Sequence, residues 1–394
     1  MRQADRFGLH LGEFSFDFGK AIERSREVVD RFRRGLAFLF RKNGIELVQG
    51  VGRLRDANTI EVEGHEAISA RSIIIATGAS PRLLPELALS KRIMTSRQAL
   101  ERKDLPQKIL ILGGGNIGLE FTSIYLAYGL EVTVVEQLPH ILPREDAEIA
   151  DMVAGILSKR GVVLKTGIGV EKVIENEREV SLLLANGERL SGDALLLSIG
   201  VTPNTRGIGL ELLDIKTERG YISINEKMRT SLPNVYAIGD ITGLLPLAHV
   251  AAAQGVIAAD EIAGKKTLPL HYERIPRVTY SIPQIASVGL AEEELREKGV
   301  SYSVGRFPFS ASGLGPATEE TDGQVKLLFD SSYGSVLGAH IAGAEASELI
   351  APLALSMESE GTIEEILGTI FAHPTMSEAI KEAALASRGM ALNL

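Results

Sequence analysis

The sequence has no cysteine, and this absence excludes disulfide bonds and thiolate metal ligands within its 394 residues. No apolar run approaches the roughly 18 residues that cross a bilayer. The N-terminal stretch MRQADRFGLH also lacks the apolar core of a signal peptide. Basic residues are scattered and the net charge is −9, which gives no reason to expect nucleic-acid binding. We therefore expect a cytoplasmic protein with no metal site and no nucleic-acid or membrane partner.

The residues that are present indicate a globular chain of two or three domains, with 45% hydrophobic and 24% charged residues. Apolar spacing predicts a helix over residues 13–43, followed by short strands up to residue 78. Further helices are expected over 144–160, 248–263, 345–360, 362–368 and 376–387. After residue 289 the expected strands precede the expected helices, which indicates a separate α+β unit at the C-terminus.

A glycine-rich turn lies between two expected strands within residues 108–136. The stretch KILILGGGNIGLE carries Gly113, Gly115 and Gly118 in the G-x-G-x-x-G order of a dinucleotide-binding βαβ unit. Gly113 would form the tight turn, Gly115 would let a pyrophosphate approach the backbone, and Gly118 would let the helix pack on the sheet. The helix is expected to turn four side chains inward: Ile117, Phe121, Ile124 and Tyr125.

The strand EVTVVE ends at Glu136, whose carboxylate can accept hydrogen bonds from a ribose diol. Its charge would repel a 2′-phosphate, and the next residues, QLPH, offer no arginine. The pattern therefore favours NAD over NADP. The alternative is a structural glycine turn with Glu136 merely exposed.

Two stretches of the chain repeat each other, IIIATGASPR (73–82) and LLLSIGVTPN (195–204). Each is an apolar strand that ends in glycine, with a proline three residues later, so we interpret them as equivalent ends of two related domains. A first domain as long as the second would have its own glycine motif upstream of Met1, and none occurs in residues 1–77. We therefore expect the first domain to lack its opening βαβ unit.

These stretches, together with TSLPNVYAIGD, PLAHVAAAQG, RIPRVTYSIPQIASVG, VLGAHIAGAEASELI and HPTMSE, resemble the flavin- and pyridine-nucleotide-dependent disulfide reductases. Within that family they resemble most the class I dihydrolipoyl dehydrogenases, collinearly over residues 17–385. The resemblance implies an α/β fold with two Rossmann-like FAD/NAD(P)-binding domains, the first incomplete, and a C-terminal α+β dimerisation domain. The implied domains are 1–104 (incomplete FAD-binding), 105–224 (NAD-binding), 225–271 (return to the FAD-binding domain) and 272–394 (dimerisation).

The resemblance also implies FAD and NAD as cofactors. The residues implied for FAD are Gly52, Thr77, Gly78, Asp240, Leu247, Ala248 and His249. Those implied for NAD and its surroundings are Gly113, Gly114, Gly115, Asn116, Ile117, Gly118, Glu120, Glu136 and Gly200.

In HPTMSE, His373 and Glu378 have the appearance of a general base with its orienting carboxylate. The resemblance implies a catalytic dyad that reaches across a homodimer interface and takes up the proton of a thiol at the redox disulfide. It also implies a 2-oxo acid dehydrogenase complex, or another lipoyl protein, as partner. The rival His340, in LGAHIAG, is expected to be structural.

Three features of the family's N-terminal part are absent: the first G-x-G-x-x-G, the C-x-x-x-x-C redox pair, and the lysine that follows it. Glu120 is therefore predicted to lack its lysine partner, and residues 73–75 are predicted to be exposed by the loss of a central strand. FAD binding should be weakened, and the chain as written is not expected to be a competent enzyme. A misplaced start is favoured over a shortened gene, so we expect the missing motifs to be encoded upstream of Met1.

The leading hypothesis is an oxidoreductase of the dihydrolipoyl dehydrogenase type, which passes electrons between a dithiol/disulfide substrate, FAD and NAD. One alternative is an NADH-oxidising diaphorase or quinone reductase that uses no disulfide. The other is a non-catalytic, dimerising remnant that binds NAD alone.

Overall fold

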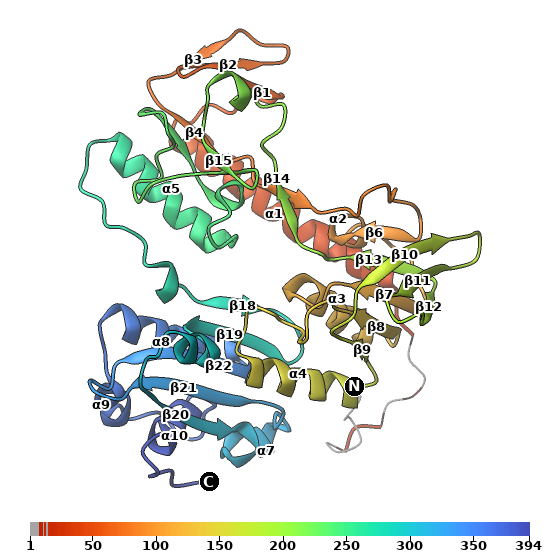
Figure 1. Cartoon of the computed structure of the whole chain (residues 1–394), viewed down its shortest axis with the longest axis vertical. Helices are drawn as coiled ribbons and strands as arrows, with labels where there is room; N and C mark the ends of the chain where they lie inside the picture. The colour runs from red at the N-terminus through yellow and green to blue at the C-terminus, as the bar shows by residue number, and fades with distance from the viewer. Residues whose placement is uncertain (1–7, 11, 13–14) are drawn as a thin grey trace.

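The computed structural model describes residues 8–10, 12 and 15–394. Met1, and residues 13 and 14 of the first expected helix, lie outside this range. The chain forms three units (Figure 1). The first combines the red, orange and green segments at the top, the second holds the sheet beside the yellow helix α4, and the blue C-terminal unit lies below. No helix in the described part of the chain is long and apolar enough to cross a membrane.

The first unit is built from segments far apart in the sequence. Its elements are α1 (Phe18–Lys42), β1 (Gly52–Asp56), β2 (Thr59–Val62), β3 (Ile68–Ser69), β4 (Ile73–Ile75), β15 (Thr217–Glu218), β16 (Tyr221–Ile222), β17 (Val235–Ala237) and α5 (Ala248–Ile262). Strands β1–β2–β3 form an antiparallel sheet, and β4 pairs with β17 in parallel. This two-stranded parallel pair agrees with an incomplete nucleotide-binding sheet in the described residues.

The expected exposure of residues 73–75 is wrong for two of the three side chains. Ile73 and Ile75 are each only 5% exposed, because they point into a core with Leu54 and Val235. Successive side chains in a strand face opposite sides, so only Ile74, at 38% exposure, lies on the uncovered face.

The second unit has the architecture expected around the glycine motif. Its parallel sheet has the order β6 (Ile93–Thr95), β13 (Ala194–Leu197), β7 (Lys108–Leu112), β8 (Glu131–Val135) and β9 (Val163–Lys165). Its other elements are α2 (Ser96–Ala99), α3 (Asn116–Ala127), α4 (Ala147–Lys159) and the antiparallel sheet β10 (Val170–Glu175), β11 (Val180–Leu184) and β12 (Arg189–Gly192). The predicted β7–α3–β8 unit is confirmed. Strand β6 joins this sheet although it precedes the boundary expected at residue 105.

The buried face of α3 differs from the expected one. Phe121 and Tyr125 are buried as predicted, but Ile117 and Ile124 are 37% and 39% exposed. The inner face also includes Thr122 and Ser123, whose hydroxyls donate to backbone carbonyls one turn earlier in the same helix. Because these hydroxyls are satisfied locally, small polar residues can occupy the buried face and the two isoleucines lie outside it.

The two repeated stretches pair with each other. Strand β5 (Ala79–Pro81) runs antiparallel to β14 (Val201–Pro203), so the end of one repeat hydrogen-bonds to the end of the other. The repeat found in the sequence is therefore also the physical connection between the first and second units.

The C-terminal unit is an antiparallel sheet with helices, as expected. Its strand order is β18 (Arg277–Thr279), β19 (Gln284–Gly289), β22 (Val336–Gly343), β21 (Gln324–Asp330) and β20 (Tyr302–Pro308). Its helices are α6 (Glu292–Glu297), α7 (Leu314–Thr318), α8 (Ala346–Glu358), α9 (Ile363–Gly368) and α10 (Glu378–Ala386). Side chains from α8, α9 and α10 share a core with one face of this sheet, whereas Ile285 and Ala342 on the other face join the core of the second unit.

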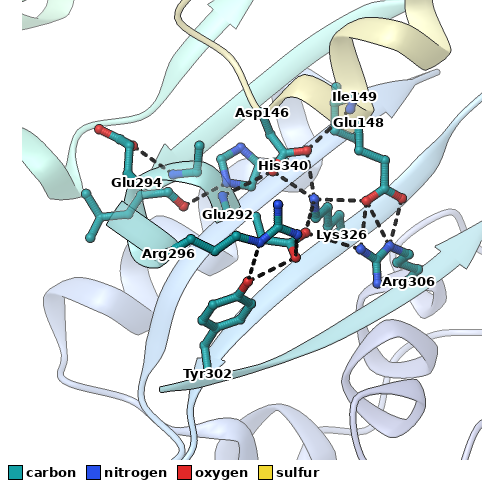
Figure 2. A network of polar contacts seen from close by, with 12 residues as sticks. Asp146, Glu148, Ile149, Glu292, Glu294, Arg296, Tyr302, Arg306, Lys326 and His340 are labelled. Carbon is teal, nitrogen blue, oxygen red and sulfur yellow. Dashed lines mark hydrogen bonds and ion pairs between the residues drawn. The ribbon is translucent and has the colours of Figure 1, made fainter. Parts of the chain in front are cut away.

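The face of the C-terminal sheet that meets the second unit carries a row of polar side chains, one from each strand. Direct cross-strand pairing places them in the order Arg277, Ser287, His340, Lys326 and Arg306. This sheet face packs against the N-terminus of α4, so the row lies at the junction of the second and C-terminal units (Figure 2).

Lys326 lies at the centre of this junction with its side chain only 1% exposed. Its ammonium group is 2.8 Å from Asp146, 2.9 Å from Glu148 and 2.7 Å from Glu292. Arg306 in turn donates to Glu148 and Glu292 (Figure 2). We call these five side chains the Lys326 cluster. A buried cation is stable only when it is paired in this way, so the cluster holds the two units in one arrangement.

The Lys326 cluster should make stability depend on pH in the acid range. Burial opposes ionisation of Glu148, but hydrogen bonds from Arg306 and Lys326 prevail and lower its pKa from 4.5 to about 2. Burial is the largest single influence on Glu292 and raises its pKa, but the hydrogen bond and charge of Lys326, together with hydrogen bonds from Tyr302 and Arg296, outweigh it, so the net pKa is lowered. Carboxyls with depressed pKa values stabilise the fold above their unfolded-state pKa and lose that contribution as pH falls through the folded value.

We therefore expect the free energy of unfolding, measured by urea titration, to fall as pH is lowered from about 4.5 to about 2. The Glu148→Gln variant should show a flatter dependence over the same window. Glu171→Gln, at an exposed strand position, serves as the control and should follow the wild type. An identical slope for Glu148→Gln and the wild type would contradict this assignment.

Candidate functional site

The glycine loop at the end of β7 has the geometry that a dinucleotide requires. Gly113 has a φ of +105°, and a Cβ atom there would lie 2.4 Å from the Ser198 carbonyl oxygen. A Cβ on Gly118 would lie 2.1 Å from the carbonyl oxygen of Gly113, so α3 approaches the turn too closely for any side chain. A Cβ on Gly115 would meet nothing within 4 Å, which leaves open space against the backbone. The three glycines therefore meet three different steric requirements, and the approach of a pyrophosphate to Gly115 stays a prediction.

The N-terminus of α3 faces this open space without a side-chain cap. Gly115 is the N-cap residue, and Asn116 and Ile117 begin the helix. Unsatisfied N–H groups at a helix N-terminus attract phosphate oxygens. Gly200 lies just beyond β13, next to the strand that carries the loop, with a φ of +99°.

Glu136, at the end of β8, lies beside the glycine loop and binds it directly. The residue is 9% exposed, and its carboxylate accepts the N–H of Gly114 at 2.8 Å and that of Leu138 at 2.9 Å. Each carboxylate oxygen keeps a second lone pair that can accept a ribose hydroxyl. The residue therefore also fixes the loop itself, a contact that the sequence pattern did not indicate.

His373 and Glu378 lie together as predicted, at the start of α10. The Nδ1 atom of His373 is 2.9 Å from Oε1 of Glu378, and the N–H of Thr375 donates to Oε2 at 2.8 Å. Burial raises the pKa of Glu378, but these two hydrogen bonds outweigh it and the net pKa is lowered. The ionised carboxylate holds the proton on Nδ1, which leaves Nε2 as the proton acceptor. The imidazole side chain is 75% exposed and so is accessible to a reacting group.

Asp240 follows strand β17 in a short 3₁₀ turn, Gly239–Thr242. Its half-buried carboxylate forms no hydrogen bond or ion pair with the described part of the chain, so it can accept ligand hydroxyls. Nearby, α5 begins at Ala248 after Leu247, again without a side-chain cap. The acidic side chain suits the hydroxyls of a ribityl chain, and the open helix N-terminus suits the polar edge of a flavin ring.

Gln254 supports this turn and was missed by sequence reasoning. It is fully buried, accepts the N–H of Gly239 at 2.6 Å and donates to the Tyr272 hydroxyl at 2.9 Å. The available signal was a single amide among the alanines and valines of α5. A polar residue in that setting normally needs specific partners.

The remaining residues predicted for FAD lie on separate segments. Thr77 and Gly78 form a turn bound to Asn204. Asn204 exchanges two hydrogen bonds of 2.9 Å with Thr77 and donates its backbone N–H to the Gly78 carbonyl oxygen, also at 2.9 Å. Gly52 begins β1 in a different sheet, and His249 is exposed with its Nε2 3.0 Å from the Pro276 carbonyl oxygen. That these residues share one FAD site stays a prediction.

Glu120 and His340 are both buried or half-buried, and neither forms an ion pair with the described residues. Glu120 accepts the Tyr280 N–H at 3.1 Å, and burial raises its pKa despite that bond. His340 is 1% exposed, its Nε2 is 2.9 Å from the Leu290 carbonyl oxygen, and burial lowers its pKa. It is a structural histidine next to Lys326.

Comparison with known families extends this picture. Residues 6–255 match the family described as pyridine nucleotide-disulphide oxidoreductase, and residues 275–384 match its dimerisation domain. The dihydrolipoyl dehydrogenase of Zymomonas mobilis is 43% identical over 405 residues, which covers 100% of this chain and 86% of the relative. That of Mycobacterium tuberculosis is 39% identical over 390 residues, 97% of this chain and 84% of the relative.

Solved structures give the same result. LpdA from Mycobacterium tuberculosis superposes with a TM-score of 0.90 at 30% identity, over 97% of this chain and 85% of that one. The HOCl-induced flavoprotein disulfide reductase RclA from Escherichia coli superposes with a TM-score of 0.87 at 29% identity, over 94% and 86%. These matches confirm the predicted fold class. Because they span both nucleotide-binding regions and the dimerisation domain, this chain belongs to the pyridine nucleotide-disulphide oxidoreductases, a family of α/β oxidoreductases that use FAD and NAD.

Proposed function

We propose that this chain serves a dihydrolipoyl dehydrogenase-type reaction, in which a dithiol is oxidised to a disulfide and NAD⁺ is reduced. The observation that supports this most is the His373–Glu378 pair, 2.9 Å apart on a scaffold of this family. A route that needed only NADH and a flavin would have no use for an oriented base of this kind.

The protein's own groups have distinct roles in this proposal. Oxidation of a dithiol releases two protons and two electrons, and NAD⁺ takes up both electrons and one proton as hydride. The second proton is accepted at Nε2 of His373, while Glu378 stabilises the resulting imidazolium. When bound, FAD supplies the two-electron chemistry between sulfur and nicotinamide.

The NAD half of the reaction is assigned to the second unit. Gly113, Gly115 and Gly118 would seat the pyrophosphate at the start of α3, and Glu136 would accept the ribose hydroxyls. On the flavin side, Asp240 and the N-terminus of α5 would contact the ribityl chain and ring. We retain the proposed division into residues 1–104, 105–224, 225–271 and 272–394, with β6 added to the NAD-binding sheet.

The chain contains no cysteine, so His373 has no thiol partner within these 394 residues. We therefore propose that these residues alone support NADH oxidation but not turnover of a disulfide. This observation favours the second candidate function, a diaphorase or quinone reductase, for the isolated chain. We further propose a homodimer in the cytoplasm, with a lipoyl protein of a 2-oxo acid dehydrogenase complex as the dithiol carrier.

A pair of glycine variants tests the NAD site. Gly115→Ala should leave the melting temperature unchanged, because its methyl group meets no protein atom, yet weaken NADH binding. We expect a loss of more than about tenfold, since hydrogen bonds to a charged phosphate contribute about 1.5–3 kcal/mol. Gly118→Ala should lower the melting temperature by about 2–10 °C through overpacking.

Fluorescence titration with NADH and thermal unfolding together measure both effects. Gly155→Ala is the matched control, because its methyl group would also meet nothing within 4 Å but lies on α4, away from the loop. Equal NADH affinity for Gly115→Ala and the wild type would contradict the proposed site.

An activity comparison tests the reaction assignment. The purified chain, incubated with FAD and then freed of unbound flavin by gel filtration, should show flavin absorbance at about 450 nm and oxidise NADH with a quinone, because hydride transfer needs no thiol. It should not reduce lipoamide, and His373→Gln should leave the quinone rate unchanged. Lipoamide reduction by the wild type would contradict the proposal that these residues alone do not turn over a disulfide. Colourless protein that still binds NADH would support the non-catalytic remnant instead.

A further inference from the structure

Asp146 connects the Lys326 cluster to the nucleotide-binding loop. It is the N-cap residue of α4, is fully buried, and accepts the N–H of Ile149 within its own helix. From the C-terminal unit it receives two hydrogen bonds of Lys326, at 2.9 and 2.8 Å, and the N–H of Glu292 at 3.2 Å. Because a buried carboxylate needs all of these partners, the C-terminal unit fixes the position of Asp146 (Figure 2).

Residues 137–146 connect Glu136, at the proposed nucleotide site, to Asp146. At the start of this segment, the N–H of Leu138 donates to the Glu136 carboxylate. Further along, the N–H of Leu142 donates to the Gly114 carbonyl oxygen at 2.8 Å. Ile141 and Leu142 are each 1% exposed, and Ile141 lies against Gly114, where a Cβ would be only 3.0 Å from its Cγ2 atom. The segment therefore packs against the glycine loop at Gly114, and its last residue, Asp146, belongs to the Lys326 cluster.

A second contact reinforces the same connection. Glu145, immediately before Asp146, has a side chain 5% exposed with Oε1 3.5 Å from Nε of Arg277 on β18. Two consecutive residues of the segment are thus paired with cations of the C-terminal sheet.

From these contacts we infer that Asp146 and Lys326 are positioning residues for dinucleotide binding, through which the C-terminal unit sets the affinity of the glycine loop for NADH. The inference rests on the NAD site proposed above. Neither residue contacts the nucleotide: the ion pair holds residues 137–146, and these residues hold the Gly114 peptide.

The test uses Asp146→Asn, Lys326→Met and a matched control. Asparagine keeps the size and the N-cap ability of aspartate but removes the charge. The control is Asp322→Asn, which removes the 2.8 Å ion pair with Arg160 at the opposite end of α4, between the same two units. NADH affinity is measured by fluorescence titration, and thermal unfolding is recorded for each variant.

We expect Asp146→Asn and Lys326→Met each to weaken NADH binding about tenfold, and Asp322→Asn to stay within about twofold of the wild type. The double variant should be no weaker than either single variant, because the two residues act as one pair. Unchanged NADH affinity in Asp146→Asn, or an equal loss in Asp322→Asn, would overturn the inference even if stability falls.

Amide hydrogen exchange of the ligand-free protein separates this inference from the proposed function. Residues 138–145 should exchange faster in Asp146→Asn but not in Asp322→Asn. If the wild type binds no NADH, the proposed function fails. The exchange result then still decides whether the ion pair positions this segment: unchanged exchange would overturn the inference.

Discussion

The structure depends on one buried cation. Lys326 lies on β21, next to the edge strand of the C-terminal sheet, and is surrounded by carboxylates from α4, its N-cap and α6. Removing such a charge from water costs several kcal/mol, and only close, complete pairing offsets that cost. This pairing depends on geometry, because each carboxylate must lie at a fixed position around the ammonium group. It therefore fixes how the second and C-terminal units meet, beyond what the apolar contact of Ile285 and Ala342 requires.

The first and second units are joined by backbone hydrogen bonds rather than by buried charge. Their repeated ends pair as β5 and β14, and Asn204 bonds to the turn at Thr77 and Gly78. Backbone pairing of this kind satisfies the polar groups of both strand ends. The backbone pairing and the buried charge are thus unlike junctions, and the first and second units also meet where Phe18 of α1 packs against Tyr128 and Lys103 pairs with Glu23. The proposed nucleotide site lies between these junctions, on the unit that takes part in both.

Sequence reasoning succeeded where local patterns carry the information. Gly113, Gly115 and Gly118 follow an apolar strand at fixed spacing, and their roles follow from backbone sterics alone. The pairing of His373 and Glu378 was suggested by a histidine and a carboxylate five residues apart, and the family resemblance strengthened it, since that separation by itself does not decide the contact. The structure confirms that contact at 2.9 Å. The catalytic role remains a proposal.

Reasoning from sequence failed where burial is decided by distant partners. Ile117 and Ile124 were expected inside because they are apolar, but locally satisfied hydroxyls of α3 occupy that face. The Lys326 cluster could not be foreseen, because its members lie near residues 146, 292, 306 and 326 and no periodicity links them. A lysine in a strand is usually solvent-exposed, so its burial here is a property of the tertiary fold.

The central claim is that buried charge makes the second and C-terminal units unfold together. Differential scanning calorimetry of the wild type and Lys326→Met tests this most directly, with Glu364→Gln on the exposed surface of α9 as control. The account predicts one cooperative transition for the two units in the wild type and the control. It predicts a separate, earlier transition of the C-terminal unit in Lys326→Met, because removing one partner of a buried pair costs about 3–5 kcal/mol. A single transition at an unchanged temperature in Lys326→Met would contradict it.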